Sequence, residues 1–252
     1  MDITSIEQDY LERIKKLCLP ERKEANPYLV LCVYGDGVRA PEKWNAKVYR
    51  DKDGNLTLVT VDMVTLKRMI EGRSTASGKK VITVDDAGWG FPLGGVLIGA
   101  TDEKRIETGL IGIECFQGAC FKEHAYLRGA AQVTLDLIKR FKASPDDTQV
   151  EICSGYINSE SKNALREAGF EVSVVEVTGL LQFELEQQFK EYVDTLGYHA
   201  YFDPKEVHDA GTPFKKVIEW IDEKPEERMK LAKSGWKYFT ARDKKSAAEN
   251  TK

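Results

Sequence analysis

Two adjacent aspartates, Asp85 and Asp86, stand where a strand-like run rich in β-branched residues gives way to a glycine-rich segment. Adjacent carboxylates supply the hard oxygen ligands that divalent cations prefer. The glycines that follow the pair are Gly88, Gly90, Gly94 and Gly95. Because glycine lets the backbone come close to a ligand, the segment 81–100 is predicted to be the functional centre and to hold a metal ion.

A further carboxylate is expected from a long helix predicted over about 121–142. Side chains alternate along a strand, so at most one of Asp85 and Asp86 aims straight into a given site. Glu123 lies three residues before Tyr126 and seven before Ala130, so it extends their apolar stripe toward the sheet by one turn. The alternative is that Glu123 is an ordinary first-turn acid that faces the helix dipole.

The last acid is expected on a helix predicted over 180–196. Glu184 and Glu186 flank its apolar stripe, and Glu184 shares more of that face. The residues that define the stripe are Leu181, Leu185, Gln188, Tyr192 and Leu196. We therefore expect Asp85, Glu123 and Glu184 to converge.

The composition is that of an ordinary globular chain. At 252 residues, with 42% hydrophobic and 31% charged residues, the chain can bury a substantial core. No apolar run reaches the roughly 18 residues of a membrane span, and residues 1–7 do not resemble a signal peptide, so we expect a cytoplasmic protein with no membrane association. The net charge of -4 gives no global attraction to nucleic acid. The odd number of cysteines, five, argues against a disulfide framework.

The hydrophobic pattern predicts an α/β protein in which a mixed sheet is flanked by helices. The helices are expected over 6–19, 63–71, 121–142, 159–168, 180–196 and, in two pieces split near Pro225, 213–238. The strands are expected over 28–34, 47–50, 56–61, 81–85, 95–101, about 106–115, 148–154 and 170–177. Strands that come first and then alternate with helices favour a mixed sheet.

Three parts are predicted along the chain. Residues 1–78 form a small N-terminal α/β extension, residues 79–200 form the core, and residues 201–252 form a helical C-terminal segment with a frayed end. The small polar residues of 72–80 mark the first boundary. No internal repeat is found.

The first motif, Asp85-Asp86-Ala87-Gly88-Trp89-Gly90, resembles that of the ribonuclease H-like superfamily. It is most similar to type 2 ribonucleases H, whose motif reads Asp-Glu-Ala-Gly-Arg-Gly. The element order, with Glu123 opening the first long helix, resembles type 1 enzymes. The placement of the N-terminal extension is similar to that in type 3 enzymes. The resemblance covers about residues 80–197.

This resemblance implies a ribonuclease H-like fold and a nuclease that uses Mg²⁺ or Mn²⁺ to cut phosphodiesters in RNA or RNA–DNA hybrid. Carried over residue by residue, it makes Asp85, Glu123 and Glu184 the catalytic and metal-binding acids. Substrate would contact Asp86, Gly88, Trp89, Gly90 and Ser154. In type 2 enzymes the glycine-flanked loop reads the 2′-hydroxyl that distinguishes RNA from DNA. The oligomeric state is not implied.

Two departures from the pattern open an alternative. Trp89 replaces the arginine of the motif, which exchanges a phosphate contact for a stacking surface. Ser154 stands at a strand end where the family pattern has an aspartate. This change removes one metal ligand unless Glu151 or Glu160 takes its place. The alternative function is therefore a catalytically inactive nucleic-acid or nucleotide-binding module, in which Trp89, Phe91 and Tyr156 form an aromatic contact surface.

Two further classes are weighed. Cys115, Cys120, His124 and Cys153 carry zinc-ligand chemistry, but the spacing of Cys115 and Cys120 is unlike a zinc knuckle and favours buried thiols. Actin-like ATPases share the core topology, but they need a duplicated core and this chain has one copy.

Overall fold

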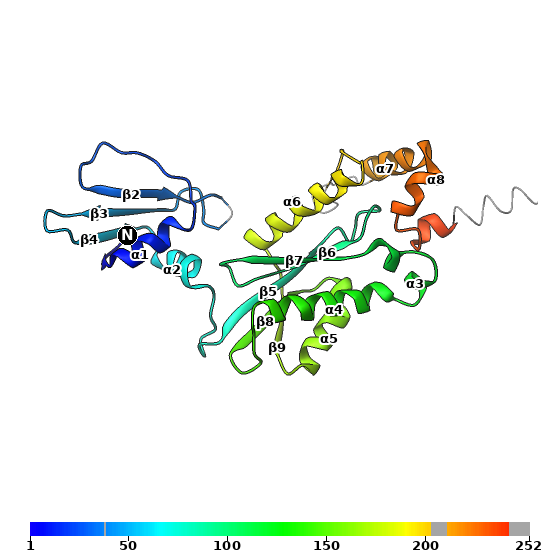
Figure 1. The fold of residues 1–252 in the computed structure, drawn as a ribbon, viewed down its shortest axis with the longest axis horizontal. Helices are drawn as coiled ribbons and strands as arrows, with labels where there is room; N and C mark the ends of the chain where they lie inside the picture. Colours follow the sequence, from blue (N-terminus) through cyan, green and yellow to red (C-terminus); the bar gives the residue numbers. More distant parts are fainter. Residues whose placement is uncertain (38, 203–210, 242–252) are drawn as a thin grey trace, which may run out of the picture. The chain divides into compact units, whose positions relative to one another are not determined.

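The computed structural model describes residues 1–37, 39–202 and 211–241, which form two compact units. The first unit comprises Met1–Val81 and Asp102–Arg105, and the second comprises Ile82–Thr101 together with the described residues from Ile106 onward. Each unit has a sheet of its own (Figure 1). The prediction of an α/β protein with a mixed sheet flanked by helices is confirmed.

The first unit is an antiparallel sheet with two helices. Its strands lie in the order β1-β4-β3-β2. The elements are β1 (Asp2–Ile6), α1 (Gln8–Lys15), β2 (Leu29–Tyr34), β3 (Asn45–Arg50), β4 (Leu56–Thr60) and α2 (Met63–Glu71). The predicted hairpin is present, whereas the N-terminal residues pair with β4 as a strand, so the first helix begins at Gln8 and not at Ile6.

The second unit is built on a five-stranded mixed sheet in the order β7-β6-β5-β8-β9. Its strands are β5 (Lys80–Ala87), β6 (Val96–Thr101), β7 (Ile106–Ile111), β8 (Thr148–Cys153) and β9 (Glu171–Val175). The strands β5, β6 and β7 form an antiparallel meander, while β8 and β9 are parallel. The central strand β5 therefore ends next to β8, and both run into the loops that form the site.

Helices cover both faces of this sheet (Figure 1). On one face, α4 (Ala125–Arg140) packs on β6 and β7 and contacts α5 (Ser159–Glu167). On the other face, α6 (Leu180–Thr195) packs on β6. Two strand glycines admit these helices, since a Cβ at Gly109 would meet Val133 of α4 and one at Gly99 would meet Leu185 of α6. The sheet thus has two separate apolar cores.

The C-terminal helices complete the core on the α6 face. They are α7 (Gly211–Glu223), α8 (Pro225–Arg228) and the 3-10 turn Met229–Leu231. Val217 and Ile221 of α7 and Phe239 beyond it are buried in one cluster with Phe91 and Phe189. Two helical pieces split at Pro225 agree with the prediction, and the predicted frayed end at 242–252 lies outside the described residues.

Two predicted elements differ from those observed. The helix expected over 121–142 is divided into α3 (Gly118–Lys122) and α4, because His124 adopts a left-handed backbone conformation with φ of 55°. The strand expected to reach residue 115 ends at Ile111, and Ile113–Phe116 forms a 3-10 turn. Among the described helices, none is long and apolar enough to cross a bilayer.

Candidate metal and nucleic-acid site

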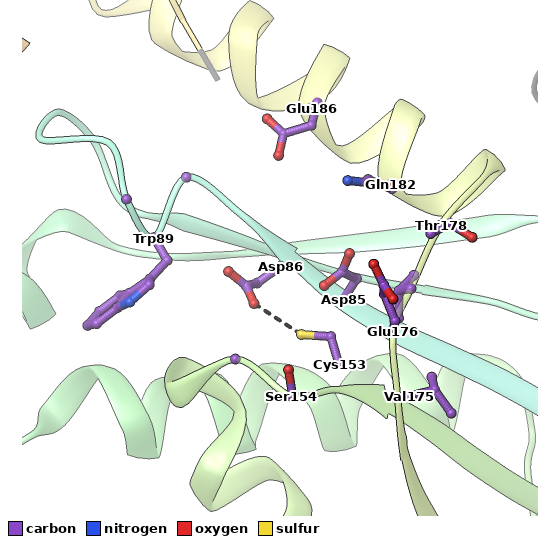
Figure 2. Close-up of a pocket in the computed structure, with 14 residues that line it drawn as sticks. Asp85, Asp86, Trp89, Cys153, Ser154, Val175, Glu176, Thr178, Gln182 and Glu186 are labelled. Atoms are coloured by element: carbon purple, nitrogen blue, oxygen red, sulfur yellow. Dashed lines mark hydrogen bonds between the residues drawn. The ribbon is translucent and has the colours of Figure 1, made fainter. Parts of the chain in front are cut away.

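A pocket of about 470 Å³ lies where β5, β8 and β9 end beneath α6 (Figure 2). Its walls come from four chain segments of the second unit. The lining residues are Asp85, Asp86, Gly88, Trp89, Gly90, Cys153, Ser154, Gly155, Val175, Glu176, Val177, Thr178, Gln182 and Glu186. Asp85 and all the residues predicted to touch substrate are among them.

Asp85 and Asp86 reach the pocket from opposite faces of β5. Asp85 pairs with Gly99, whose open face lies against α6, and Asp86 pairs with Ile98, which belongs to the core under α4. The predicted alternation is therefore observed, but both aspartates line the pocket because the sheet ends there and leaves the edge accessible from both sides. Asp85 is only 3% exposed, so this carboxylate is held in a largely desolvated position.

Asp86 is oriented by the last residue of β8 and by a residue of the turn that follows this strand. Asn158 Nδ2 donates to Asp86 Oδ1 over 2.9 Å and to Cys153 Sγ over 3.0 Å, and the Cys153 thiol donates to the same Asp86 oxygen over 3.4 Å. Asn158 is fully buried, and its Oδ1 has no hydrogen-bond partner among the described groups. The side chain of Asp86 is thus fixed by contacts with residues almost seventy positions away in the chain.

Asp85, Asp86 and Cys153 form a group with metal-ligand chemistry. One ligand atom from each lies within 4.8 Å of the others, and this is the one such cluster of three acidic, thiol or imidazole groups found in the described part of the chain. Burial, together with the two aspartates, raises the pKa of the Cys153 thiol far above its ordinary value. The Cys153 thiol is therefore protonated at neutral pH, and it lies beside the oxygen atoms of the two aspartates.

Two further acids line the pocket. Glu186 extends from α6 and Glu176 lies just after β9, where its side chain comes near Asp85 in the close-up (Figure 2). The Tyr201 hydroxyl donates to Glu186 Oε2 over 2.5 Å. Gln182, one helical turn before Glu186, also lines the pocket. The pocket consequently collects carboxylates from β5, from α6 and from the segment that follows β9. The first two elements are those that the sequence indicated, whereas Glu176 takes the place of an acid expected from the helix over 121–142.

The glycine turn is set by its packing. Gly88 has φ of 88°, and a Cβ there would lie 2.1 Å from Cε2 of Phe189. The Phe91 amide donates to the Gly88 carbonyl over 3.1 Å and closes the turn. A residue with a side chain cannot occupy position 88 without displacing the core under α6, so the glycine predicted for close approach is also required for packing.

Trp89 projects away from the α6 core. Its ring packs near those of Phe116, Tyr126 and Tyr156, with centroid distances of 6.2, 5.3 and 6.3 Å. Tyr156 is 55% exposed, while Phe91 is fully buried. The predicted aromatic contact surface therefore excludes Phe91, which belongs to the core with Phe189.

The structure does not bring Glu123 to the pocket. Glu123 is exposed, caps the short helix α3 and precedes the left-handed residue His124, so it does not continue the buried stripe of α4. The predicted orientation toward the sheet is wrong, because extrapolating the helical period by one turn requires an unbroken helix. Glu123 instead contributes its backbone carbonyl to a hydrogen bond from Arg128.

Glu184 does not line the pocket either. The buried residues of α6 are Leu181, Leu185, Phe189 and Val193, so the buried stripe is rotated away from the predicted positions Gln188 and Tyr192. This rotation directs Gln182 and Glu186, and not Glu184, at the pocket. The sequence contained this alternative, since Glu186 flanks the same stripe on its other side.

The possible substitutes and zinc ligands also lie elsewhere. Glu151 is buried within β8 and Glu160 is exposed, and neither lines the pocket. His124 bonds to the Tyr126 hydroxyl over 2.9 Å, and Cys120 is exposed. In the described chain Cys153 groups with the two aspartates and not with Cys115, Cys120 and His124.

A buried lysine escaped the sequence analysis. Lys233 is fully buried, and its Nζ donates to the carbonyls of Gly88 and Phe91 over 2.5 and 2.6 Å. Burial lowers the pKa of Lys233 well below its ordinary value, and the charge of Asp86 acts in the opposite direction. No local pattern marks this residue, because it lies within the C-terminal segment 213–238, for which the sequence predicts only two helical pieces.

No family model matches the sequence, and no curated protein matches it. Among solved structures, the chain is similar to RNase H3 of Aquifex aeolicus, at 15% identity and a TM-score of 0.35, over 90% of this chain and 97% of that one. It is also similar to Bst-RNase HIII in complex with Mn²⁺, at 12% identity and a TM-score of 0.34, over 94% and 96% of the two chains.

Proposed function

We propose that this chain is a metal-dependent phosphodiesterase that acts on RNA-containing nucleic acid, with Asp85 and Asp86 as metal ligands. The observation that carries the proposal is the pair of carboxylates at the end of β5. One is almost fully buried, and both line one pocket with Glu176 and Glu186. Carboxylates that share one pocket, with one of them desolvated, are stabilised by a cation.

The donor set fits a divalent cation. Carboxylate oxygens are the preferred ligands of Mg²⁺ and Mn²⁺, and Glu176 and Glu186 can add to the two aspartates. The orphaned Oδ1 of buried Asn158 is a further polar group beside the cluster. When bound, the cation supplies Lewis acidity and a more acidic water for phosphodiester hydrolysis. Glu123 and Glu184, the acids predicted for this task, are not part of the proposed ligand set.

The chain's own residues supply orientation. Asn158 holds Asp86 in one direction through its hydrogen bond, which is how outer partners tune metal ligands. At Gly90 no side chain keeps a phosphate or ribose away from the backbone, whereas the missing side chain of Gly88 leaves room for Phe189. The exposed ring of Tyr156 beside Trp89 offers a stacking surface for a base or sugar. Together with the first motif, these features favour an RNA or RNA–DNA hybrid substrate.

A second candidate function is a binding module that does not cut. It is favoured by the end of β8, where Cys153 and Ser154 provide a thiol and a hydroxyl in place of a carboxylate. Such a module binds the same nucleic acids through the glycine turn and the aromatic rings.

The two functions separate in one assay. End-labelled RNA–DNA hybrid, double-stranded RNA, single-stranded RNA and double-stranded DNA are each incubated with the protein in Mg²⁺, Mn²⁺ or EDTA. We expect cleavage of the hybrid in Mg²⁺ or Mn²⁺, none in EDTA, and none by Asp85→Asn. Hybrid binding in Ca²⁺ with no cleavage in either active ion would establish the module and reject the nuclease.

A further inference from the structure

A short C-terminal segment, Lys230–Gly235, is joined by hydrogen bonds to Pro92 and Gly94, which follow Asp85 and Asp86 in the chain. We name this segment the clasp. Its backbone accepts from the Gly94 amide at Leu231 over 2.8 Å, and the Lys233 amide donates to the Pro92 carbonyl over 2.9 Å. Gln117 Nε2 donates to the carbonyls of Lys230 and Ala232, each over 2.9 Å. The clasp is therefore fixed by hydrogen bonds to Pro92, Gly94 and Gln117.

The Lys233 side chain connects the clasp to the turn formed by Gly88–Phe91. Its Nζ atom lies among three rings, those of Phe116, Phe189 and Trp236, at 5.3, 5.9 and 5.4 Å from their centroids. Rings alone do not offset the desolvation of a fully buried lysine. The two carbonyls it binds, at Gly88 and Phe91, are the two ends of the turn.

These bonds dictate which side of the turn faces the pocket. In a trans peptide the carbonyl and the following N–H point in opposite directions. Because the Gly88 carbonyl points toward Lys233, the Trp89 N–H points away from it. Gly88, Trp89 and Gly90 line the pocket, whereas the buried Lys233 is not among its lining residues.

We propose that Lys233 is a positioning residue of the pocket: by holding the carbonyls of Gly88 and Phe91 it presents the Trp89 backbone N–H to an anionic oxygen of the substrate backbone. The inference rests on the proposed function, since it takes a phosphodiester as the ligand. Backbone N–H groups that converge at a turn are suited to anions because they carry partial positive charge and need no counterion. Lys233 itself does not touch the substrate.

The test compares Lys233→Met with Lys233→Arg, and uses Lys237→Met, an exposed lysine four residues away, as the matched control. Affinity for an RNA–DNA hybrid is measured by fluorescence anisotropy in Ca²⁺, and Mn²⁺ affinity is measured separately by electron paramagnetic resonance. We expect Lys233→Met to weaken hybrid binding roughly tenfold, the effect of one charge-assisted hydrogen bond. Mn²⁺ affinity stays within about twofold of wild type, because the hydrogen bonds of the Lys233 side chain go to backbone carbonyls, while Asn158 and Cys153 orient Asp86.

The split between the two affinities distinguishes positioning from a merely structural role, which would weaken both together. Partial recovery in Lys233→Arg is expected, because the guanidinium also donates to carbonyls. Should Lys233→Met not fold, amide NMR of the wild type gives the answer. The Trp89 N–H resonance shifts on addition of hybrid if the inference holds, and an unmoved resonance overturns it.

Failure of this inference differs from failure of the nuclease proposal. Wild-type protein that binds hybrid and cuts none rejects the nuclease alone. Hybrid affinity in Lys233→Met equal to that of wild type and Lys237→Met, equal losses of hybrid and Mn²⁺ affinity, or a wild type that binds no hybrid each overturn the positioning role.

Discussion

The end of β5 and the junction between α3 and α4 both carry acids that the sequence marks as metal ligands, and the fold treats them differently. At the end of β5, Asp85 is 3% exposed and Asp86 is bound by Asn158 and Cys153. At the helix junction, Glu123 is exposed and its carbonyl binds Arg128. An acid at the end of a central strand is positioned by its ladder, whereas an acid beyond a helix end is positioned only if the helix continues.

The variant Asp85→Asn tests whether the acid at the end of β5 is needed for cleavage. We expect loss of roughly 1000-fold or more in hybrid cleavage, because a metal ligand worth several kcal/mol in the transition state is removed. Thermal unfolding should show little loss of stability, since one of two neighbouring carboxylates becomes neutral. Cleavage rates and calorimetry measure the two effects, and retained cleavage in this variant would reject the site.

Gly88→Ala tests the packing side of the same region. The new Cβ meets Phe189 at 2.1 Å and the backbone keeps a positive φ, so we expect about 3 kcal/mol of destabilisation in urea unfolding. Gly118→Ala is the matched control, because it has φ of 50° with nothing within 4 Å. It should cost only about 1 kcal/mol. Equal losses of stability in the two variants would show that the Phe189 ring moves aside to admit the new Cβ.

Thiol chemistry reports on the electrostatics of the cluster. The pKa of Cys153 is raised by burial and by the two aspartates, so little thiolate is present near pH 8. We expect its alkylation by iodoacetamide to be roughly 100-fold slower than that of exposed Cys120, because the thiolate is the nucleophile. Peptide mass spectrometry of a labelling time course measures both rates. Comparable rates would show that the cluster does not suppress ionisation.

The smallest expected changes are in Mn²⁺ affinity, when single acids of α6 or Glu123 are replaced. Glu186→Gln should lower Mn²⁺ affinity roughly tenfold, as expected for loss of a ligand or of a partner next to one. Glu184→Gln and Glu123→Gln should leave the affinity within about twofold, because neither residue lines the pocket. Titration of the three variants, followed by electron paramagnetic resonance, gives the ranking. A larger loss in Glu123→Gln than in Glu186→Gln would restore the acid set predicted from sequence.

Local patterns were sufficient where a property repeats over neighbouring residues. The hairpin of β3 and β4, the strands of the central sheet and the helix α6 follow from period and turn residues. The pattern Asp85-Asp86 followed by glycines also located the pocket, because a buried strand must end in a loop at the sheet edge. The same reasoning failed at His124, whose left-handed backbone conformation no periodicity signals.

From the sequence alone, an α/β chain can be predicted with a carboxylate pair and a glycine turn at the end of one strand. The tertiary structure decided which other groups join them. The rotation of α6 brought Glu186 and not Glu184 to the pocket, and the C-terminal return of the chain brought Lys233 beneath the turn. These are contacts between residues far apart in sequence. Their geometry is set by the packing of whole helices and strands, which the conformational preferences of neighbouring residues do not specify.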